Sequence, residues 1–487
     1  MTNAISTQHP LYIQVAPDWT LMRDAYTGER QIKGKGAIYL PFTQSQLQDG
    51  VDNVNQAGWK AYDAYRKRAR FPNFVREAVQ TAVGMMHAQP AKISLPVGME
   101  KIVSVRGENL QQILRKINEE QLITGRCGLL LDLPNKPSAT AIPYIAFYNA
   151  ERIINWDDGR VEQLVPQILN LVVLNETESE RTEIFSWETK SDKYRVLVLG
   201  DPLANESDGV YRAGIFDDAG RSFRSEALTT PSFRGSELKE IPFVIVNCCD
   251  LVSETDEPPL LDLGNMCMTI YRGDADYRQN LFMQGQDTLV VIGSSADEDE
   301  AVRIGAGARI DVPMGGDVKY AGVNSNGLEE QRTALENLEK RAGTMGAQTL
   351  DSTSRERESG VSMQIRVAAR TADLHQIALT GAKGLENLLK IAARWMRLDS
   401  DEVSVEPNLK FGGRMVTGQS MVEMQTARNL GYPISAKSLH DLAVDEGLTK
   451  LTFEEEMAQA RSEEDTPFAK AQTGDRNPDQ VGDGVGA

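Results

Sequence analysis

The residues of this chain that are best suited to chemistry lie far apart and form no catalytic or metal-binding motif. No two of the four histidines form an HExxH-type pair, and no serine lies in a GxSxG elbow. The four cysteines lack metal-ligand spacing and predict reduced thiols in the protein core. These residues are His9, His87, His375, His440, Cys127, Cys248, Cys249 and Cys267. The sequence therefore predicts no catalytic residue, no metal site, no cofactor and no enzyme.

Two glycine-rich segments resemble nucleotide-binding loops only in part. In residues 28–36 the glycine spacing is one residue longer than in a P-loop, and Gly36 replaces the Ser or Thr that holds magnesium. Residues 305–307 lack the third glycine and the following helix of a dinucleotide fingerprint. Both segments are therefore interpreted as turns.

Composition predicts a folded chain of several structural units. The chain has 487 residues, is 41% hydrophobic and carries a net charge of −18, so it exceeds what one core usually covers. The excess of acidic over basic residues argues against tight binding of nucleic acid through its phosphates. A channel lined by acidic residues would nevertheless let a moving DNA duplex pass without sticking. No window approaches the roughly 18 apolar residues that span a bilayer, and the first residues do not resemble a signal peptide.

Residues 1–257 carry the elements of an α+β domain. Residues 1–40 are weakly patterned, helices are expected within 44–87 and 109–122, and the run 66–70 (RKRAR) is interpreted as a solvated helix face rather than a phosphate contact. Alternating or apolar segments then predict strands. Those strands are expected at 127–133, 143–148, 153–156, 165–174, 183–187, 194–199, 210–216 and 242–246.

A helical hairpin is expected next, with a small β-rich insert at its end. The first helix begins at Pro258, and only Asp274 interrupts its apolar stripe of Leu263, Cys267, Ile270, Tyr277 and Leu281. The stripe of the second helix contains Leu328, Leu335, Leu338, Ala342 and Met345. Strands are predicted at 288–292 and 308–312, and the acidic turn 297–300 is too charged to bury.

The last third is expected to be mainly helical. Residues 350–360 are too polar for a core, and a long helix is predicted from Val361 to Arg397, with Gly381 and Gly384 as kink points. A strand at 403–411 and short helices near 420–430, 436–446 and 453–462 follow, the last with a capping box of Thr452 and Glu455. The tail 463–487 is predicted to be disordered.

Several phrases of the sequence, taken in order, resemble the portal proteins of tailed bacteriophages, in particular a portal family once known only as a domain of unknown function. The likeness covers most of residues 39–460. It is carried by Tyr39-Leu40-Pro41, 65–73 (YRKRARFPN), 153–156 (IINW), 240–243 (EIPF), 258–263 (PPLLDL), 275–285 and Trp395-Met396. None of these is a catalytic signature.

The resemblance implies a mainly helical α+β portal fold whose copies form a ring of twelve. The implied regions are a wing (1–257), stem helix 1 (258–285), a clip (286–324), stem helix 2 (325–348), a tunnel loop (349–360), a long wing and tunnel helix (361–398), a crown (399–462) and a disordered tail (463–487). The ring would sit at one capsid vertex of the virion, form in the host cytoplasm, and pass double-stranded DNA during packaging and ejection.

The resemblance also implies partners and contact residues. The terminase large subunit, the head-tail adaptor and the major capsid and scaffolding proteins would bind the ring, and no membrane is involved. DNA would meet the tunnel loop at Ser352, Thr353, Ser354, Arg355, Glu356 and Arg357. The motor or adaptor would meet the clip at Asp297, Glu298, Asp299, Glu300 and Arg303. Stem packing is expected from Leu263, Cys267, Ile270, Tyr277, Leu281, Leu335 and Leu338. Another phage head or adaptor protein, or an enzyme without a motif, remains an alternative.

Overall fold

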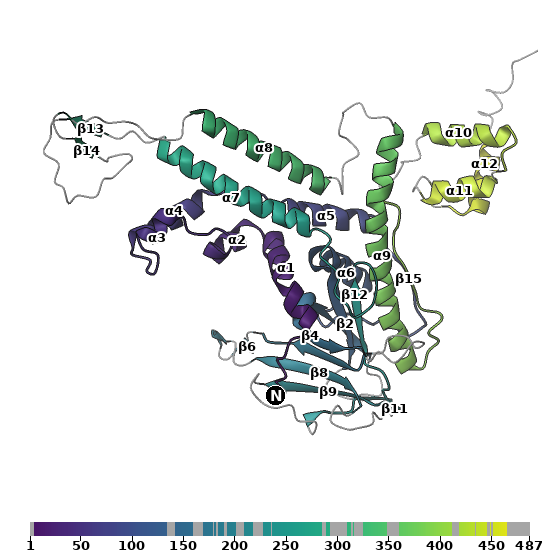
Figure 1. Ribbon diagram of the computed structural model, residues 1–487. Helices are drawn as coiled ribbons and strands as arrows, with labels where there is room; N and C mark the ends of the chain where they lie inside the picture. Colours follow the sequence, from purple (N-terminus) through teal and green to yellow (C-terminus); the bar gives the residue numbers. More distant parts are fainter. Residues whose placement is uncertain are drawn as a thin grey trace, which may run out of the picture. The chain divides into compact units, whose positions relative to one another are not determined.

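The computed structural model describes most of residues 4–464 (Figure 1). It leaves out 134–141, 159–168, 179, 182–183, 189–191, 201–208, 218–226, 235, 285–288, 293–308, 313–314, 316–324, 348–359, 412–417, 434, 446–448 and 450. The chain forms two compact units, Met1–Leu409 and Lys410–Ala487, so residues 399–409 of the predicted crown belong to the larger unit. The described chain contains both helices and sheets, which is compatible with the predicted α+β class. No described helix is long and apolar enough to cross a membrane.

The N-terminal region is helical, and the prediction of a weakly patterned segment was wrong. Helix α1 (Pro10–Thr27) begins with a proline in its first turn, and the His9 ring accepts a hydrogen bond from the Leu11 N–H. Trp19 and Met22 are fully buried on one face of α1. The apolar spacing was present in the sequence, but Pro17 interrupts it near the centre of the helix.

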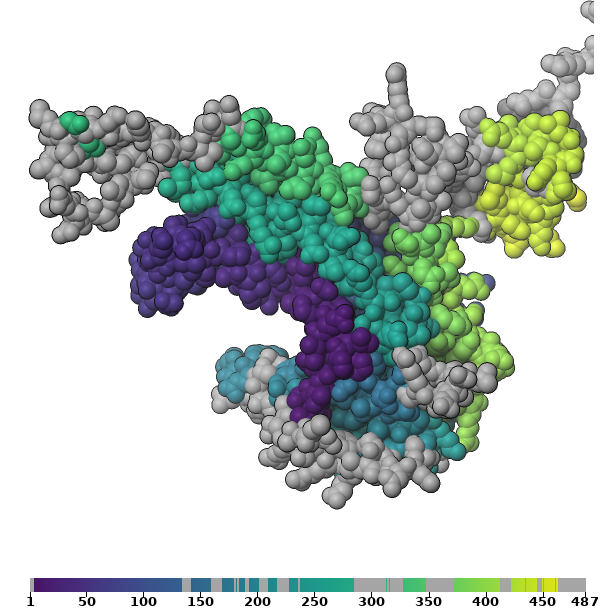
Figure 2. Space-filling view, in the orientation of Figure 1, coloured from purple at the N-terminus to yellow at the C-terminus, as the bar shows by residue number. Residues whose placement is uncertain are grey.

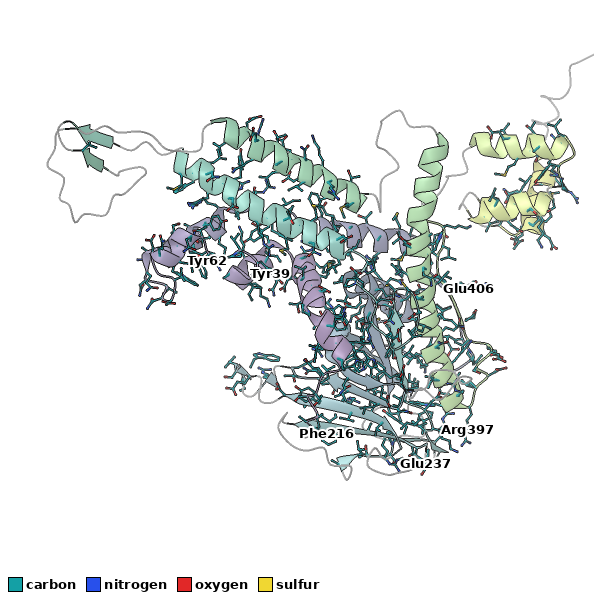
Figure 3. All side chains as sticks on the ribbon, viewed as in Figure 1. Tyr39, Tyr62, Phe216, Glu237, Arg397 and Glu406 are labelled. Carbon is teal, nitrogen blue, oxygen red and sulfur yellow. The ribbon has the colours of Figure 1, made fainter. Side chains whose placement is uncertain are left out.

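A glycine joint connects α1 to α2 (Glu29–Lys35), in the segment that resembled a P-loop in part. Gly28 has a φ of 95°, and a Cβ at this position would lie 2.5 Å from the Asn73 side chain. Tyr39 follows and donates a hydrogen bond to the buried Asp24 carboxylate at 2.6 Å, while Tyr62 donates to the Leu40 carbonyl at 2.9 Å (Figure 3). Gly28 and Gly36 therefore allow the chain to turn at the two ends of α2.

Three further helices complete the N-terminal layer: α3 (Gln44–Gln48), α4 (Ala57–Arg68) and α5 (Phe74–Met86). Helix α5 ends the helical block that the sequence predicted, and its apolar face, including Val75, Val79 and Ala82, is buried. Helix α6 (Leu110–Thr124) begins after Asn109, which caps it as part of a capping box with Gln112. Short 3₁₀ turns lie at Gly36–Ile38 and Ala150–Arg152.

Two antiparallel sheets form the core of the larger unit. The first has the order β12-β2-β3, from Phe243–Asn247, Arg126–Asp132 and Tyr144–Asn149. The second has the order β4-β5-β8-β9, from Ile153–Asp157, Leu171–Asn175, Lys193–Leu199 and Tyr211–Asp217. Small pairs are formed by β6 (Glu180–Arg181) with β7 (Trp187–Glu188) and by β10 (Ser232–Phe233) with β11 (Ser236–Glu237). Most predicted strands are confirmed in type, with shifted ends.

Helix α9 (Gly360–Met396) packs along α6 and the first sheet as one uninterrupted helix, so the predicted kinks at Gly381 and Gly384 are wrong. Both glycines instead allow close approach. A Cβ at Gly384 would lie 2.4 Å from a Val246 methyl group, and one at Gly381 would lie 2.4 Å from the Asn118 amide. We call this pair of close contacts the glycine seam.

The predicted strand at 403–411 is shorter than expected. Only β15 (Ser404–Glu406) forms, and it pairs antiparallel with β1 (Lys92–Ser94). The smaller unit contains α10 (Gly418–Asn429), α11 (Ala436–Asp445) and α12 (Phe453–Glu464), as the sequence predicted. The capping box at the start of α12 is confirmed, because the Thr452 N–H donates to Glu455 Oε2 at 2.9 Å and the Glu455 N–H donates to Thr452 Oγ1.

Candidate functional site

The candidate functional site is the hairpin of α7 (Leu261–Gln284) and α8 (Ser325–Ala347), which lie side by side in the larger unit (Figure 1). The first half of α7 is its buried base. Leu263, Cys267 and Ile270 are at most 2% exposed, and α1 and α5 pack against this half. Gly264 lets Met22 of α1 approach so closely that a Cβ would lie 2.6 Å from its sulfur. Burial raises the pKa of the Cys267 thiol to about 11.

Asp274, which interrupts the apolar stripe, fixes the chain between α4 and α5 to α7. Its carboxylate accepts a hydrogen bond from the Arg70 backbone N–H at 2.6 Å and pairs with Arg278 at 2.8 Å. Two residues earlier, Arg272 donates to the Tyr39 carbonyl at 2.9 Å. Asp274 and Arg272 thus both attach α7 to the N-terminal layer.

The basic run 66–70 is not simply a solvated helix face, because two of its arginines contact other parts of the chain. Arg68 lies over the Phe282 ring at 4.0 Å and also donates to Gln279, so it joins the end of α4 to the second half of α7. Arg66 pairs with Asp63 at 2.8 Å and donates to the Lys33 carbonyl. Two arginines of the run are therefore occupied by contacts within the chain.

Helix α8 contacts α7 through one narrow stripe. Leu335 and Leu338 are half-buried and Ala342 is fully buried, and the Leu335 side chain lies 3.0 Å from where a Cβ of Gly273 would be. Asn280 donates to Gln331 across the pair at 3.1 Å. Helix α8 lies at the surface of the molecule (Figure 2). Its exposed charged residues are Glu329, Glu330, Arg332, Glu336, Glu339, Lys340 and Arg341. The hairpin therefore buries little of its second helix within one chain.

The far end of α7 is open to solvent. Tyr277 is half-buried, and Leu281, Phe282 and Met283 are 43%, 42% and 40% exposed. Of the predicted stem-packing residues, Leu263, Cys267 and Ile270 are thus in the core, Tyr277, Leu335 and Leu338 are partly covered, and Leu281 is exposed.

Two short strands follow in the insert between the helices. Strand β13 (Leu289–Ile292) pairs in parallel with β14 (Arg309–Val312). The sequence prediction of two strands in the insert is thus confirmed. Within the described part of the insert these strands pair only with each other. The predicted clip residues 297–300 and 303 and the predicted tunnel-loop residues 352–357 lie outside the described residues.

Three histidines make packing or hydrogen-bond contacts within the fold. The His9 ring stacks on Trp156 with centroids 4.1 Å apart, His87 bonds Asn118 at 2.9 Å, and His375 bonds the Leu409 carbonyl. Burial lowers the pKa of His87, and burial with the nearby Arg126 lowers that of His9. Packing therefore disfavours the charged form of His9 and His87, and the three histidines are not brought together.

Residues 259–396 match the family model described as Domain of unknown function (DUF4055). The matched segment contains α7, β13, β14, α8 and α9, so the similarity covers the hairpin and the helix after it. No curated protein matches the chain.

Among solved structures, the chain is similar to one titled "Neck of native GTA particle computed with C12 symmetry". The identity is 12%, the alignment covers 78% of this chain and 91% of that one, and the TM-score is 0.33. A likeness at this level carries no argument about function.

Proposed function

We propose that this chain is a phage portal subunit, which forms a ring of twelve copies at one capsid vertex and surrounds a channel for double-stranded DNA. The observation that carries the proposal is the α7–α8 hairpin: a long helical pair, buried at its base and open along its second helix, with a β insert at its end. This is the arrangement expected of a stem and clip. The resemblance in the order of the sequence phrases supports the same assignment.

The open hairpin favours assembly with further copies. A helix with one narrow apolar stripe is stabilised mainly by packing, and α8 has only α7 and α5 as extensive neighbours in the described part of the chain. A two-stranded sheet is marginal alone and gains stability from further strands. A ring of identical subunits supplies both kinds of neighbour around a closed axis.

The charge on α8 fits a passage for DNA better than a binding site. The charged residues of its exposed surface include four acids and three bases, and Arg332 already pairs within the helix with Glu329 and Glu336. Such a face makes weak, sequence-independent contacts with phosphates. Together with the net charge of −18 per chain, this surface would let a duplex slide.

In this proposal the protein is not an enzyme. The terminase large subunit would dock on the ring during filling, and the head-tail adaptor would follow. Major capsid and scaffolding proteins would surround the ring during assembly in the host cytoplasm, and the virion would retain it. The clip residues 297–300 and 303 are the proposed contacts for the motor or adaptor.

Negative-stain electron microscopy of the purified chain, with mass determined by light scattering, tests the ring. Particles with a central hole and a mass near twelve chains are expected. A particle of one to four chains that does not change with concentration would contradict the proposal and favour the enzyme alternative.

The channel is tested separately with Arg355→Gln and Arg357→Gln together. Rings should form as in the parent chain, while DNA packaging or retention falls. The matched control is Lys437→Gln in the smaller unit, which should leave both unchanged. A double variant that fails to form rings would refute the assignment of 349–360 to the tunnel.

A further inference from the structure

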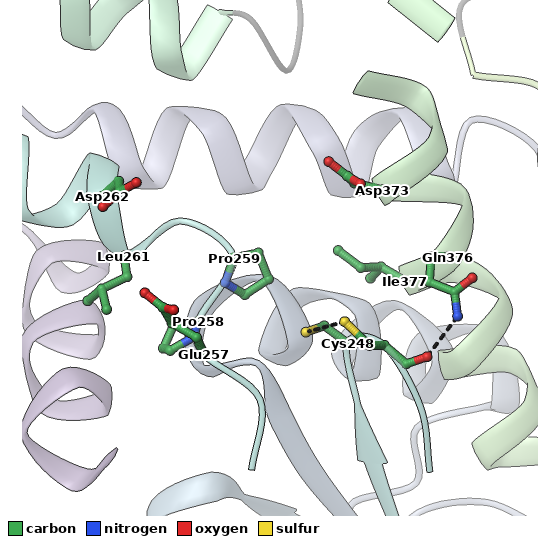
Figure 4. A pocket seen from close by; sticks show the side chains of 10 residues that line it. Cys248, Glu257, Pro258, Pro259, Leu261, Asp262, Asp373, Gln376 and Ile377 are labelled. Carbon is green, nitrogen blue, oxygen red and sulfur yellow. Dashed lines mark hydrogen bonds between the residues drawn. The ribbon is translucent and has the colours of Figure 1, made fainter. Parts of the chain in front are cut away.

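A cavity of about 410 Å³ lies where the end of β12, the segment before α7 and the middle of α9 meet (Figure 4). Cys248 and Cys249 line it, together with Pro258 and Pro259 and the acidic or polar residues Glu257, Asp262, Asp373 and Gln376. All four cysteines of the chain are free, and Cys249 is exposed, so the prediction that all are core thiols was wrong for this residue. Two thiols and several carboxylates thus surround one solvent-accessible space.

The two thiols and a third ligand atom are already close together. Cys248 Sγ and Cys249 Sγ are 3.7 Å apart, and Cys248 Sγ lies 3.2 Å from Asp256 Oδ2. The ligand atoms of these three residues all lie within 4.8 Å of one another. In a tetrahedral zinc site with Zn–S bonds of about 2.3 Å, the two sulfur atoms are separated by about 3.7–3.8 Å. The observed sulfur separation therefore fits one shared ion.

We propose that Cys248, Cys249 and Asp256 bind one thiophilic divalent cation of the Zn²⁺ type, with the fourth coordination position open to the cavity. Sulfur ligands select this class of ion over magnesium and calcium, which prefer oxygen. Water, or one of the carboxylates that line the cavity, would complete the coordination. The inference uses only this cluster and does not depend on the proposed portal function.

The ligand-bearing backbone is held by its surroundings. The Cys248 N–H donates to the Gly125 carbonyl at 2.9 Å, and Thr380 of α9 donates to the Cys248 carbonyl at 3.2 Å. Gln376 donates to the Cys249 carbonyl at 2.7 Å (Figure 4). The Cys249 N–H donates to Asp256 Oδ2 at 2.9 Å, which orients the carboxylate toward the thiols. Little ordering is left for the ion to impose.

Binding is a proton exchange without oxidation. Each thiol loses one proton to solvent as its sulfur bonds the ion, so two protons are released for each cation bound. The ion, two thiolates and one carboxylate together carry a charge of about −1 by ordinary charge counting. Burial and the nearby Asp256 raise the pKa of the Cys248 thiol.

Titration of the full-length chain with Cd²⁺ and then Zn²⁺ tests this site. The protein is first stripped with a chelator and reduced with a phosphine, and a thiol count after unfolding must give four. One Cd²⁺ per chain is expected by calorimetry, with ultraviolet sulfur-to-metal absorbance that Zn²⁺ abolishes. Asp256→Asn should weaken binding by more than the roughly 10–100-fold typical of losing an outer partner of a metal site.

Cys248→Ser with Cys249→Ser should abolish binding, whereas Cys267→Ala, which removes a thiol outside the cluster, should keep it. If the double variant does not fold, Cys249→Ser alone serves, because that side chain is exposed. Unchanged stoichiometry in the cysteine variants would overturn the site, as would unchanged affinity in Asp256→Asn. The parent chain failing to bind with all four thiols reduced would overturn it as well.

Discussion

The two ends of α7 differ in what covers them, and the difference separates a buried interface within the fold from an exposed apolar surface. At the base, Ile270 and Cys267 are at most 1% exposed between the N-terminal helices. At the far end, Leu281 is 43% exposed on the same helix. The base is complete within one chain, whereas the far end offers apolar surface that only another chain, or another segment, would cover. A single helix thus carries a buried folding interface at one end and an exposed apolar surface at the other.

Ile270→Ala should break this contrast most strongly. Emptying a fully buried site should lower the free energy of unfolding by about 2–5 kcal/mol, because lost burial and a cavity both destabilise the protein. Leu281→Ala is the matched control and should cost less than about 1 kcal/mol, since that side chain is half in water. Thermal unfolding of both variants checks this, and equal losses would show that the far end is already covered in the isolated protein.

Gly384→Ala tests the close packing of α9 against β12, which lies outside the hairpin. The new Cβ would lie 2.4 Å from Val246, so overpacking should cost about 1–3 kcal/mol. Gly343→Ala in α8 is the control, because nothing lies within 4 Å of a Cβ there and the better helix former should stabilise by about 0.5–1 kcal/mol. Unfolding midpoints that move in the same direction would refute the glycine seam.

Asp274→Ala should weaken the polar attachment of α7. The Arg70 N–H loses its acceptor and Arg278 loses its partner, at a cost of about 1–2 kcal/mol. Arg278→Ala removes only the ion pair and should cost less than about 1 kcal/mol. Denaturant midpoints separate the two variants, and equal effects would mean that the bond from the Arg70 N–H contributes nothing.

Acid should also lower the stability, through Glu386 of α9. Burial would raise the pKa of this carboxyl, but hydrogen bonds from Lys383, Lys390 and the Val405 N–H outweigh burial and lower it to about 2, from an ordinary 4.5. A lowered pKa in the folded state gives stability that is present above 4.5 and is lost as the pH falls toward about 2. Glu386→Gln should remove this part of the acid dependence, and an unchanged pH profile of the melting temperature would contradict it.

Sequence patterns predicted the hairpin and most strands because apolar periodicity is local. The same reasoning placed Gly381 and Gly384 at kinks, since a glycine inside a helix is ambiguous until the packing neighbour is known. Asp274 and Arg68 were likewise interpreted from their own helices, although their partners lie about 200 residues away in the chain. Long-range polar contacts of this kind leave no periodic signal.

The cation cluster shows the same limit. Adjacent cysteines followed by an aspartate eight residues later match no ligand spacing, and only the fold after β12 turns the carboxylate back onto the thiols. The Asp256–Glu257–Pro258–Pro259 segment gave a partial signal of an ordered carboxylate, because two prolines restrict the chain conformation there. The α1 helix was missed for a different reason, since Pro17 concealed a regular apolar spacing.

The glycine seam has a mechanical consequence for α9. With no side chain between the helix and its supports at two positions one turn apart, α9 cannot roll about its axis or slide along β12 without driving backbone into Val246 or Asn118. The half of α9 after Ile377 is therefore expected to move together with β12 and α6 as one rigid body.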